Sequence, residues 1–241
     1  MSSNRGREQV LDDVRIEYER RRAFDRTHAV RRDYTAVQRR TQKEYSNMLD
    51  ACGVLPLGSS AVLDLGCGDG RFLLSCRDIW GQTAAPLCGI DLMENRIETL
   101  KSREPSLDVR AGSADQLPWD DQSFDLSHQS MLFSSVPDDD LQQRMAAETR
   151  RVTKPGGHVL WYDFVWNPMN KATVGMPFSR VRSFFPDWPV VRRRRVTLAP
   201  PLARMLARIS ESLVVAMEAL RLLNAFELIL FRKPTKAEAR P

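Results

Sequence analysis

The chain has 241 residues, of which 42% are hydrophobic and 28% are charged, and its formal net charge is +5. This length allows one large domain with a buried core, and the composition excludes a disordered or collagen-like chain. No apolar run reaches the roughly 18 residues of a membrane span, and Met1–Arg7 lacks the apolar core of a signal peptide, so we expect a cytoplasmic protein without a membrane partner.

The first fifty residues are polar, rich in helix formers and almost free of glycine. They predict one or two helices before any sheet, and we interpret residues 1–50 as a helical lid. Four of their side chains, at i, i+4, i+7 and i+11, share one helix face: Tyr34, Gln38, Thr41 and Tyr45. This face either packs on the sheet or forms an aromatic cover over a ligand.

A β-branched, apolar segment, Ala61–Leu65, contains Asp64 and leads into glycines at positions 66, 68 and 70. Glycines at this spacing let backbone N–H groups approach a ligand while the chain turns from a strand into a helix. The Gly-x-Gly-x-Gly spacing is one residue tighter than that of dinucleotide-binding folds. We therefore predict a nucleotide-like ligand other than a nicotinamide dinucleotide.

The middle of the chain alternates strand-like and helix-like segments, which predicts a parallel sheet with helices on both faces. The second strand ends at Asp91, about twenty residues after the glycines, where a carboxylate accepts both hydroxyls of a ribose. The predicted strands are Ala61–Leu65, Leu87–Ile90, Asp108–Ala111, Phe124–His128, His158–Phe164, Val190–Leu198 and Phe226–Arg232.

Loops follow the third strand at Gly112–Trp119 and precede the fifth at Lys154–Gly157. With them, the chain from Val62 to Phe164 resembles the class I S-adenosylmethionine-dependent methyltransferases, most closely their small-molecule branch, and Asp64–Gly70 is the most specific part. The resemblance implies an α/β fold with a doubly wound, seven-stranded, mostly parallel sheet whose last strand is antiparallel. It also implies S-adenosylmethionine as cofactor and a methyltransferase domain over residues 51–241.

The resemblance also implies a set of cofactor contacts. The methionine end would meet Asp64, Gly66, Cys67 and Gly68, the ribose would meet Asp91, and Leu92 would pack on the adenine. Members of the family usually carry an acidic residue where this chain has Ser113, so either Asp115 replaces that contact or it is lost. Ala114 would contribute its backbone N–H, and Gln129 and Ser130 match positions that face the methionine portion and the acceptor.

The sulfonium methyl group is already activated, so such an enzyme mainly holds a nucleophile in line with it and excludes water. A base is needed only for a hydroxyl or a protonated amine. The first candidate is His128, at the productive end of the fourth strand, although it could equally pack against a flanking helix. Asp163, near the end of the fifth strand, is the second candidate, and Tyr34 completes the catalytic set.

The predicted sixth strand contains Arg192–Arg195, which we interpret as a solvated edge strand in preference to a nucleic-acid site. Between the last two strands, apolar residues at helical spacing predict a helical insertion over residues 199–225, and we expect the stripe to be a core face. The stripe consists of Leu202, Met205, Leu206, Ile209, Leu213, Met217 and Leu220.

Trp161–Phe164 and Leu198–Arg204 are similar to segments of bacterial methyltransferases that tailor natural products. This resemblance implies a small, aromatic acceptor, with N-methylation favoured over O- or C-methylation. An RNA-modifying methyltransferase is an alternative suggested by the basic charge, but its usual Asn/Asp-Pro-Pro-aromatic motif is replaced here by His128–Phe133. A nicotinamide-dependent oxidoreductase is another alternative. The four cysteines form no Cys-x-x-Cys pair, and we expect no metal.

Overall fold

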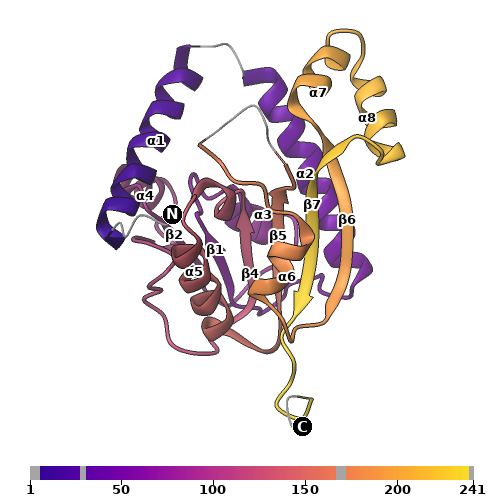
Figure 1. The fold of residues 1–241 in the computed structure, drawn as a ribbon. Helices are drawn as coiled ribbons and strands as arrows, with labels where there is room; N and C mark the ends of the chain where they lie inside the picture. The colour runs from indigo at the N-terminus through magenta and orange to yellow at the C-terminus, as the bar shows by residue number, and fades with distance from the viewer. Residues whose placement is uncertain (1–5, 28–30, 167–171, 239–241) are drawn as a thin grey trace.

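A computed structural model describes residues 6–27, 31–166 and 172–238, and its centre is one seven-stranded sheet (Figure 1). The strand order is β3-β2-β1-β4-β5-β7-β6, in which β7 runs antiparallel to both of its neighbours and the strands from β3 to β5 are parallel. The strands are β1 (Val62–Leu65), β2 (Leu87–Asp91), β3 (Asp108–Ala111), β4 (Phe124–Ser130), β5 (Thr153–Phe164), β6 (Val190–Leu198) and β7 (Asn224–Arg232). The predicted fold class is confirmed.

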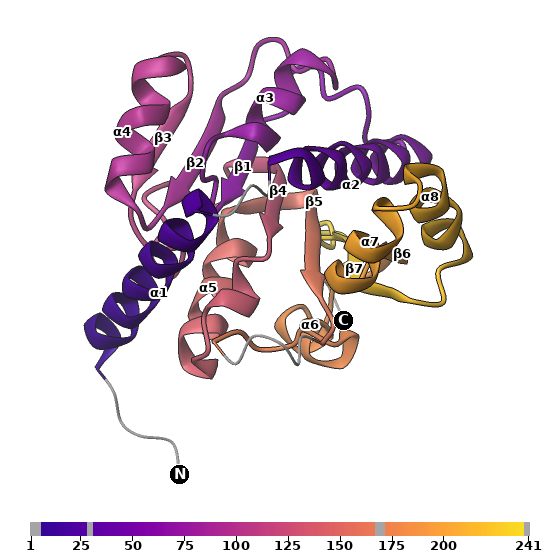
Figure 2. The same ribbon diagram turned by 90° about the horizontal axis from the view of Figure 1, so that it is seen from above.

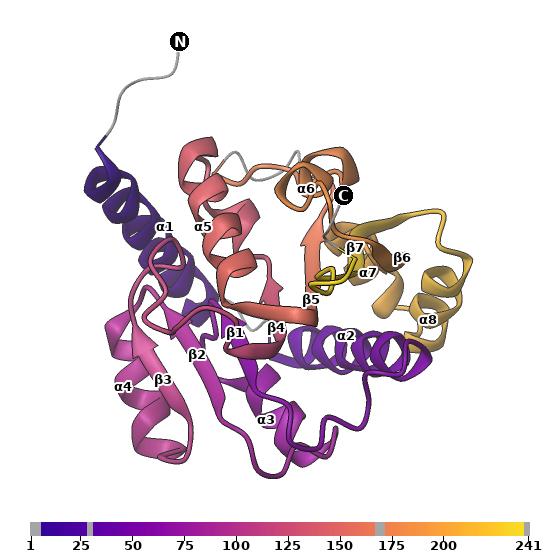
Figure 3. The same ribbon diagram turned by 90° about the horizontal axis from the view of Figure 1, so that it is seen from below.

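Helices cover both faces of the sheet, as the alternating sequence predicts (Figures 2 and 3). One face carries α2 (Arg31–Ala51), α3 (Arg71–Asp78) and α4 (Glu94–Arg103), and the other carries α5 (Asp139–Val152) and α6 (Phe178–Phe184). Every residue of β1 and β2 is buried, because both of their faces pack against helices. Each face has its own hydrophobic core.

The two N-terminal helices occupy different places. Helix α1 (Arg7–Thr27) lies across the sheet edge between α4 and α5, whereas α2 runs along one face of the sheet beside α3 (Figure 2). Tyr45, Met48 and Leu49 of α2 are buried in the core of that face. The half of α2 that carries Tyr45 therefore packs on the sheet, which is the first of the two alternatives that the sequence left open. Helix α1 is the one that covers the sheet edge.

Strand β5 differs from the prediction, whereas strand β6 agrees with it. Strand β5 begins at Thr153 and not at His158, because Thr153 already pairs with Phe124 of β4 and the Gly156 N–H bonds to the Lys233 carbonyl. Strand β6 is the sheet edge, as predicted for the arginine run.

The segment between β6 and β7 forms two helices, α7 (Pro200–Ala207) and α8 (Glu211–Leu220). Their inner sides make a small core from Leu198, Ala203 and Val214, with other apolar residues half-buried around it. The expectation that the whole apolar stripe is a core face is wrong for Met205, Ile209, Leu213 and Leu220, which are exposed. Two short helices offer only one inner side each to the sheet, so half of the stripe faces outward.

Candidate functional site

The loop after β1 is held in a shape that requires glycine. Gly66, Gly68 and Gly70 have φ values of 73°, 54° and 78°, in the left-handed region that residues with a Cβ rarely adopt. A Cβ on Gly66 would also lie 3.2 Å from the Leu132 side chain. The loop is tied to β2, since the Gly66 and Cys67 N–H groups donate to the Ile90 carbonyl at 2.8 and 3.0 Å.

Asp91 lies where β2 ends and is 7% exposed. One carboxylate oxygen accepts the Gly68 N–H at 2.9 Å, and the other accepts the Met93 N–H at 2.9 Å. The Arg96 guanidinium is 3.9 Å away. The glycine loop and this carboxylate are thus one unit at the carboxyl edge of the sheet, where open α/β sheets bind ligands.

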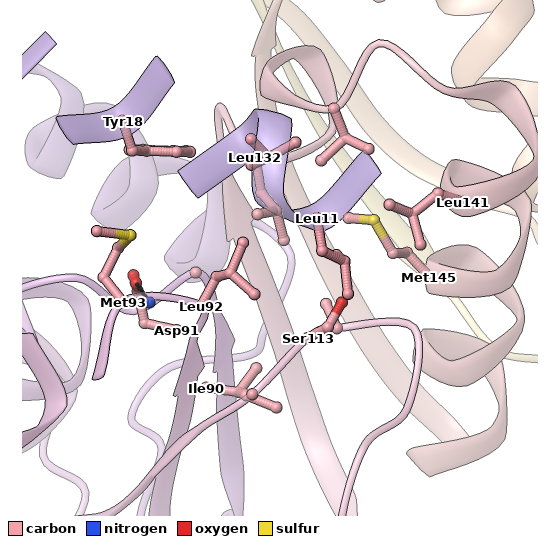
Figure 4. A pocket seen from close by; sticks show the side chains of 15 residues that line it. Leu11, Tyr18, Ile90, Asp91, Leu92, Met93, Ser113, Leu132, Leu141 and Met145 are labelled. Atoms are coloured by element: carbon pink, nitrogen blue, oxygen red, sulfur yellow. Dashed lines mark hydrogen bonds between the residues drawn. The ribbon is translucent and has the colours of Figure 1, made fainter. Parts of the chain in front are cut away.

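A pocket of about 500 Å³, including its open mouth, lies beside this unit (Figure 4). Its lining joins the loop residues to apolar side chains from α1 and α5. It consists of Leu11, Val14, Tyr18, Gly66, Ile90, Asp91, Leu92, Met93, Gly112, Ser113, Ala114, Leu132, Val136, Leu141 and Met145.

The sequence-based interpretation placed eleven residues at the ligand. It holds for the lining of this pocket at five of them, Gly66, Asp91, Leu92, Ser113 and Ala114, whereas the other six do not line it: Asp64, Cys67, Gly68, Asp115, Gln129 and Ser130. It missed the contribution of α1. A signal was present, because Val10, Leu11, Val14 and Tyr18 recur at helical spacing in an otherwise polar helix.

Asp115 lies beside the pocket and is bound by α1. The Arg7 guanidinium makes two hydrogen bonds to its carboxylate, at 2.7 and 3.0 Å, and Arg144 of α5 lies 3.4 Å away. Burial opposes ionisation, but the hydrogen bonds from Arg7 and Ser113 outweigh it and hold the pKa of Asp115 below its ordinary value. Both carboxylate oxygens therefore face cations of the protein in this arrangement.

His128 and Asp64 form a buried pair on the α2–α3 face. The Nδ1 atom of His128 is 2.7 Å from a carboxylate oxygen of Asp64, and the ring stacks on Phe72 with centroids 3.6 Å apart. Burial raises the pKa of Asp64, although the nearby imidazole opposes the change. Within the described part of the chain, the Nε2 atom of His128 has no hydrogen-bond partner.

Gln129 and Ser130 connect the loop after β4 to its surroundings. The Gln129 side chain accepts the Leu132 N–H at 3.1 Å and donates to the Tyr162 carbonyl at 3.4 Å. The Ser130 hydroxyl accepts from the Tyr45 hydroxyl at 3.5 Å. Neither residue lines the pocket of Figure 4.

Asp163 lies on the opposite face of the sheet from His128, since His128 pairs with Leu160, three residues before it on β5. It is fully buried, and its carboxylate accepts the Ser134 N–H at 3.2 Å and the Phe164 N–H at 2.9 Å. The structure therefore does not bring these two candidates together. Tyr34 belongs to α2, but its side chain is outside the described residues.

Burial raises the pKa of Asp163 to about 7, against the hydrogen bonds from Ser134 and Phe164. The folded protein keeps this proton between about pH 4 and pH 7 while the unfolded chain releases it, so the free energy of unfolding falls as the pH rises through that range. Between about pH 4 and pH 7, the free energy of unfolding of Asp163→Asn should fall by roughly 4 kcal/mol less than that of the original chain. Urea unfolding across this pH range measures the difference. Asp69→Asn, in which an exposed carboxylate is changed, should keep the original pH dependence. Equal slopes for Asp163→Asn and the original chain would contradict this assignment.

No group of three or more His, Cys, Asp or Glu side chains that could hold a metal ion occurs in residues 6–27, 31–166 and 172–238. Within the same ranges, no helix is long and apolar enough to cross a membrane.

Comparison with known proteins points to one family. Residues 62–157 match the family described as a methyltransferase domain. The demethylmenaquinone methyltransferase of Renibacterium salmoninarum is 30% identical over 117 residues, which are 48% of this chain and 46% of that protein. The chain spans less than half the length of the curated relatives that it matches first.

Solved structures show the same fold at low sequence identity. An S-adenosylmethionine-dependent methyltransferase from Mesorhizobium loti gives a TM-score of 0.58 at 18% identity, over 78% of this chain and 96% of that chain. The [4+2]-cyclase SpnF gives 0.59 at 17% identity, over 79% and 82%. Since one of these proteins is described as a cyclase, the fold by itself does not determine the reaction.

Proposed function

We infer, from the class I S-adenosylmethionine-dependent methyltransferase domain that this chain carries at residues 62–157, that it transfers a methyl group from S-adenosylmethionine to a small-molecule acceptor. The observation that supports this most is the unit of glycine loop and Asp91 carboxylate beside an apolar pocket. The sheet supports it too, because the antiparallel β7 between β5 and β6 departs from the order 3-2-1-4-5-6 of the dinucleotide-binding fold.

The residues of the pocket and of the adjoining glycine loop suit the parts of this cofactor. Gly66, which lines the pocket, and its loop neighbours Cys67 and Gly68 would face the methionine end, Asp91 would accept the ribose hydroxyls, and Leu92 would pack on the adenine. Ser113 and the Ala114 N–H are the remaining candidates for the adenine edge. When bound, the cofactor supplies an activated methyl group, and the protein has to position the acceptor and exclude water.

His128 is the base we favour for an acceptor that must lose a proton. Its Nδ1 atom is held by Asp64 at 2.7 Å, which fixes the ring and directs the unpartnered Nε2 atom toward proton acceptance. Asp64 is then a positioning residue for His128 in addition to its predicted place at the methionine end. The contacts of Asp163 with two backbone N–H groups favour a role in holding the loop after β4.

We propose an aromatic acceptor in a natural-product pathway, with N-methylation favoured over O- or C-methylation. Trp166, which follows β5 and is 72% exposed, supplies a free aromatic surface near the ligand edge, and an indole face also attracts a cationic nitrogen. In the proposed division of the chain, residues 1–50 precede a domain of residues 51–241, and α1 is the part of the first segment that acts as a lid. We propose a cytoplasmic location.

Calorimetric titration tests the cofactor. We expect S-adenosylhomocysteine to bind with measurable heat and NADH to give none, because the loop is too tight for a dinucleotide pyrophosphate. Binding of NADH alone would overturn the proposed function and favour the oxidoreductase.

Mass spectrometry identifies the acceptor. Cell extract is incubated with the protein and S-adenosylmethionine that carries a deuterated methyl group, and a small molecule gains the mass of that group. Labelled RNA with no labelled small molecule would contradict the proposed acceptor class. A steep salt dependence of RNA binding would support the same conclusion, since phosphate neutralisation releases counterions.

A further inference from the structure

The α7–α8 hairpin, which we define as residues 200–223, exposes an unusual amount of apolar surface. Seven of the twelve large hydrophobic residues that are exposed in the described part of the chain lie within it. They are Met205 (56%), Ile209 (74%), Leu213 (37%), Val215 (51%), Leu220 (60%), Leu222 (83%) and Leu223 (50%). Such a concentration is rare on soluble monomers and marks a surface that contacts something apolar.

The protein itself does not use these side chains. The inner side of the hairpin already packs through Leu198, Ala203 and Val214. The exposed residues lie on α7 (Met205), between the two helices (Ile209), on α8 (Leu213, Val215 and Leu220) and on the turn that leads into β7 (Leu222 and Leu223). In Figures 1 and 2 the hairpin projects from the sheet beside α2, and it stands at the same end of the molecule as α1.

The charges around this surface are positive. Both carboxylates of the hairpin share one cation, because Arg40 of α2 pairs with Glu211 and, at 3.0 Å, with Glu218. Arg192, Arg194 and Arg221 form no ion pair with any carboxylate of the described ranges.

These arginines lie near one another. Partial burial and then the charges of Arg192 and Arg221 lower the pKa of Arg194, against the attraction of Glu44 on α2, as expected where cations outnumber the nearby carboxylates. An apolar surface bordered by unpaired arginines complements an anionic lipid surface, into which apolar side chains insert while guanidinium groups meet phosphates.

We propose that the α7–α8 hairpin and its neighbouring arginines dock the protein on the surface of a membrane containing anionic lipid. The contact is peripheral: the two helices have 8 and 10 residues and lie in the interface without crossing it. Because β5 ends and β7 begins at this end of the sheet, docking places the ligand edge next to the bilayer. An acceptor dissolved in lipid can then reach the site without crossing water.

Vesicle sedimentation of the full chain tests this proposal. We expect binding to vesicles of phosphatidylcholine mixed with phosphatidylglycerol, weaker binding to phosphatidylcholine alone, and a loss of binding at high salt. Two variants should each bind anionic vesicles at least roughly tenfold more weakly than the original chain. They are the apolar variant Leu222→Ser/Leu223→Ser and the charge variant Arg192→Gln/Arg194→Gln. Matched controls change exposed residues elsewhere, Ile79→Ser directly after α3 and Lys101→Gln on α4, and should bind as the original chain does.

Three results would overturn the proposal. The first is equal binding of all variants to anionic vesicles, and the second is no binding of the original chain to them. The third is a dimer in light scattering that Leu222→Ser/Leu223→Ser converts to a monomer, which would show that a second copy covers the hairpin. Unchanged affinity for S-adenosylhomocysteine in the apolar and the charge variant shows that both are folded. It also keeps the outcome separate from the proposed function.

Discussion

Asp91→Ala is expected to raise the dissociation constant for S-adenosylhomocysteine by roughly a hundredfold or more. The carboxylate of Asp91 lies against the glycine loop, where it accepts the Gly68 N–H, and a hydrogen bond to a charged group contributes about 1.5–3 kcal/mol. Losing two ribose hydroxyl bonds therefore costs at least about 3 kcal/mol. Calorimetric titration of the purified variant measures the change.

The matched control is Asp69→Ala. Asp69 belongs to the same loop, but its carboxylate is half-exposed and pairs with Arg71 at the surface, so its removal should leave the affinity unchanged. Because Asp91 also accepts the Gly68 and Met93 N–H groups, the variant is assayed well below its melting temperature. If a folded Asp91→Ala protein bound S-adenosylhomocysteine as tightly as the original, the ribose assignment would be wrong.

His128→Leu is expected to lower the free energy of unfolding by about 3 kcal/mol or more near neutral pH. Asp64 is 4% exposed, and the imidazole at 2.7 Å is the partner that makes its burial tolerable. Removing that partner leaves a carboxyl group buried in an apolar layer with Phe72 and Tyr45. Urea unfolding measures the loss. This loss of unfolding free energy should be smaller at low pH, where Asp64 is protonated in both the folded and the unfolded state.

A double variant separates loss of the pair from loss of packing. Asp64→Leu/His128→Leu replaces both polar groups by apolar ones, and should recover most of the stability that His128→Leu loses. If the two single losses simply add, Asp64 and His128 do not interact energetically, and the proposed positioning of the imidazole fails.

Residues that act through their own backbone or their immediate neighbours were predictable from the sequence. The glycine loop follows from local geometry, because positive φ values at Gly66, Gly68 and Gly70 select glycine whatever the rest of the chain does. The strands β1 to β4 were predicted from short segments, and their bounds differ from the prediction by at most two residues. Asp91 was found because parallel strands bring their carboxyl ends to one edge.

Residues whose partners are distant in the chain were not predictable in this way. Arg7 binds Asp115, 108 residues away, and the sequence around each residue does not indicate its partner. The catalytic candidates His128 and Asp163 both end strands at the ligand edge, yet they face opposite sides of the sheet.

The sequence by itself thus determined the sheet, the glycine loop and the position of Asp91 at the carboxyl edge, since each depends on backbone sterics or on the two-residue period of a strand. Only the tertiary structure decided that α1 lines the pocket while α2 supports the sheet, and that half of the α7–α8 stripe faces solvent. Helical spacing shows that a face is apolar, but what covers that face depends on how segments far apart in the chain pack together.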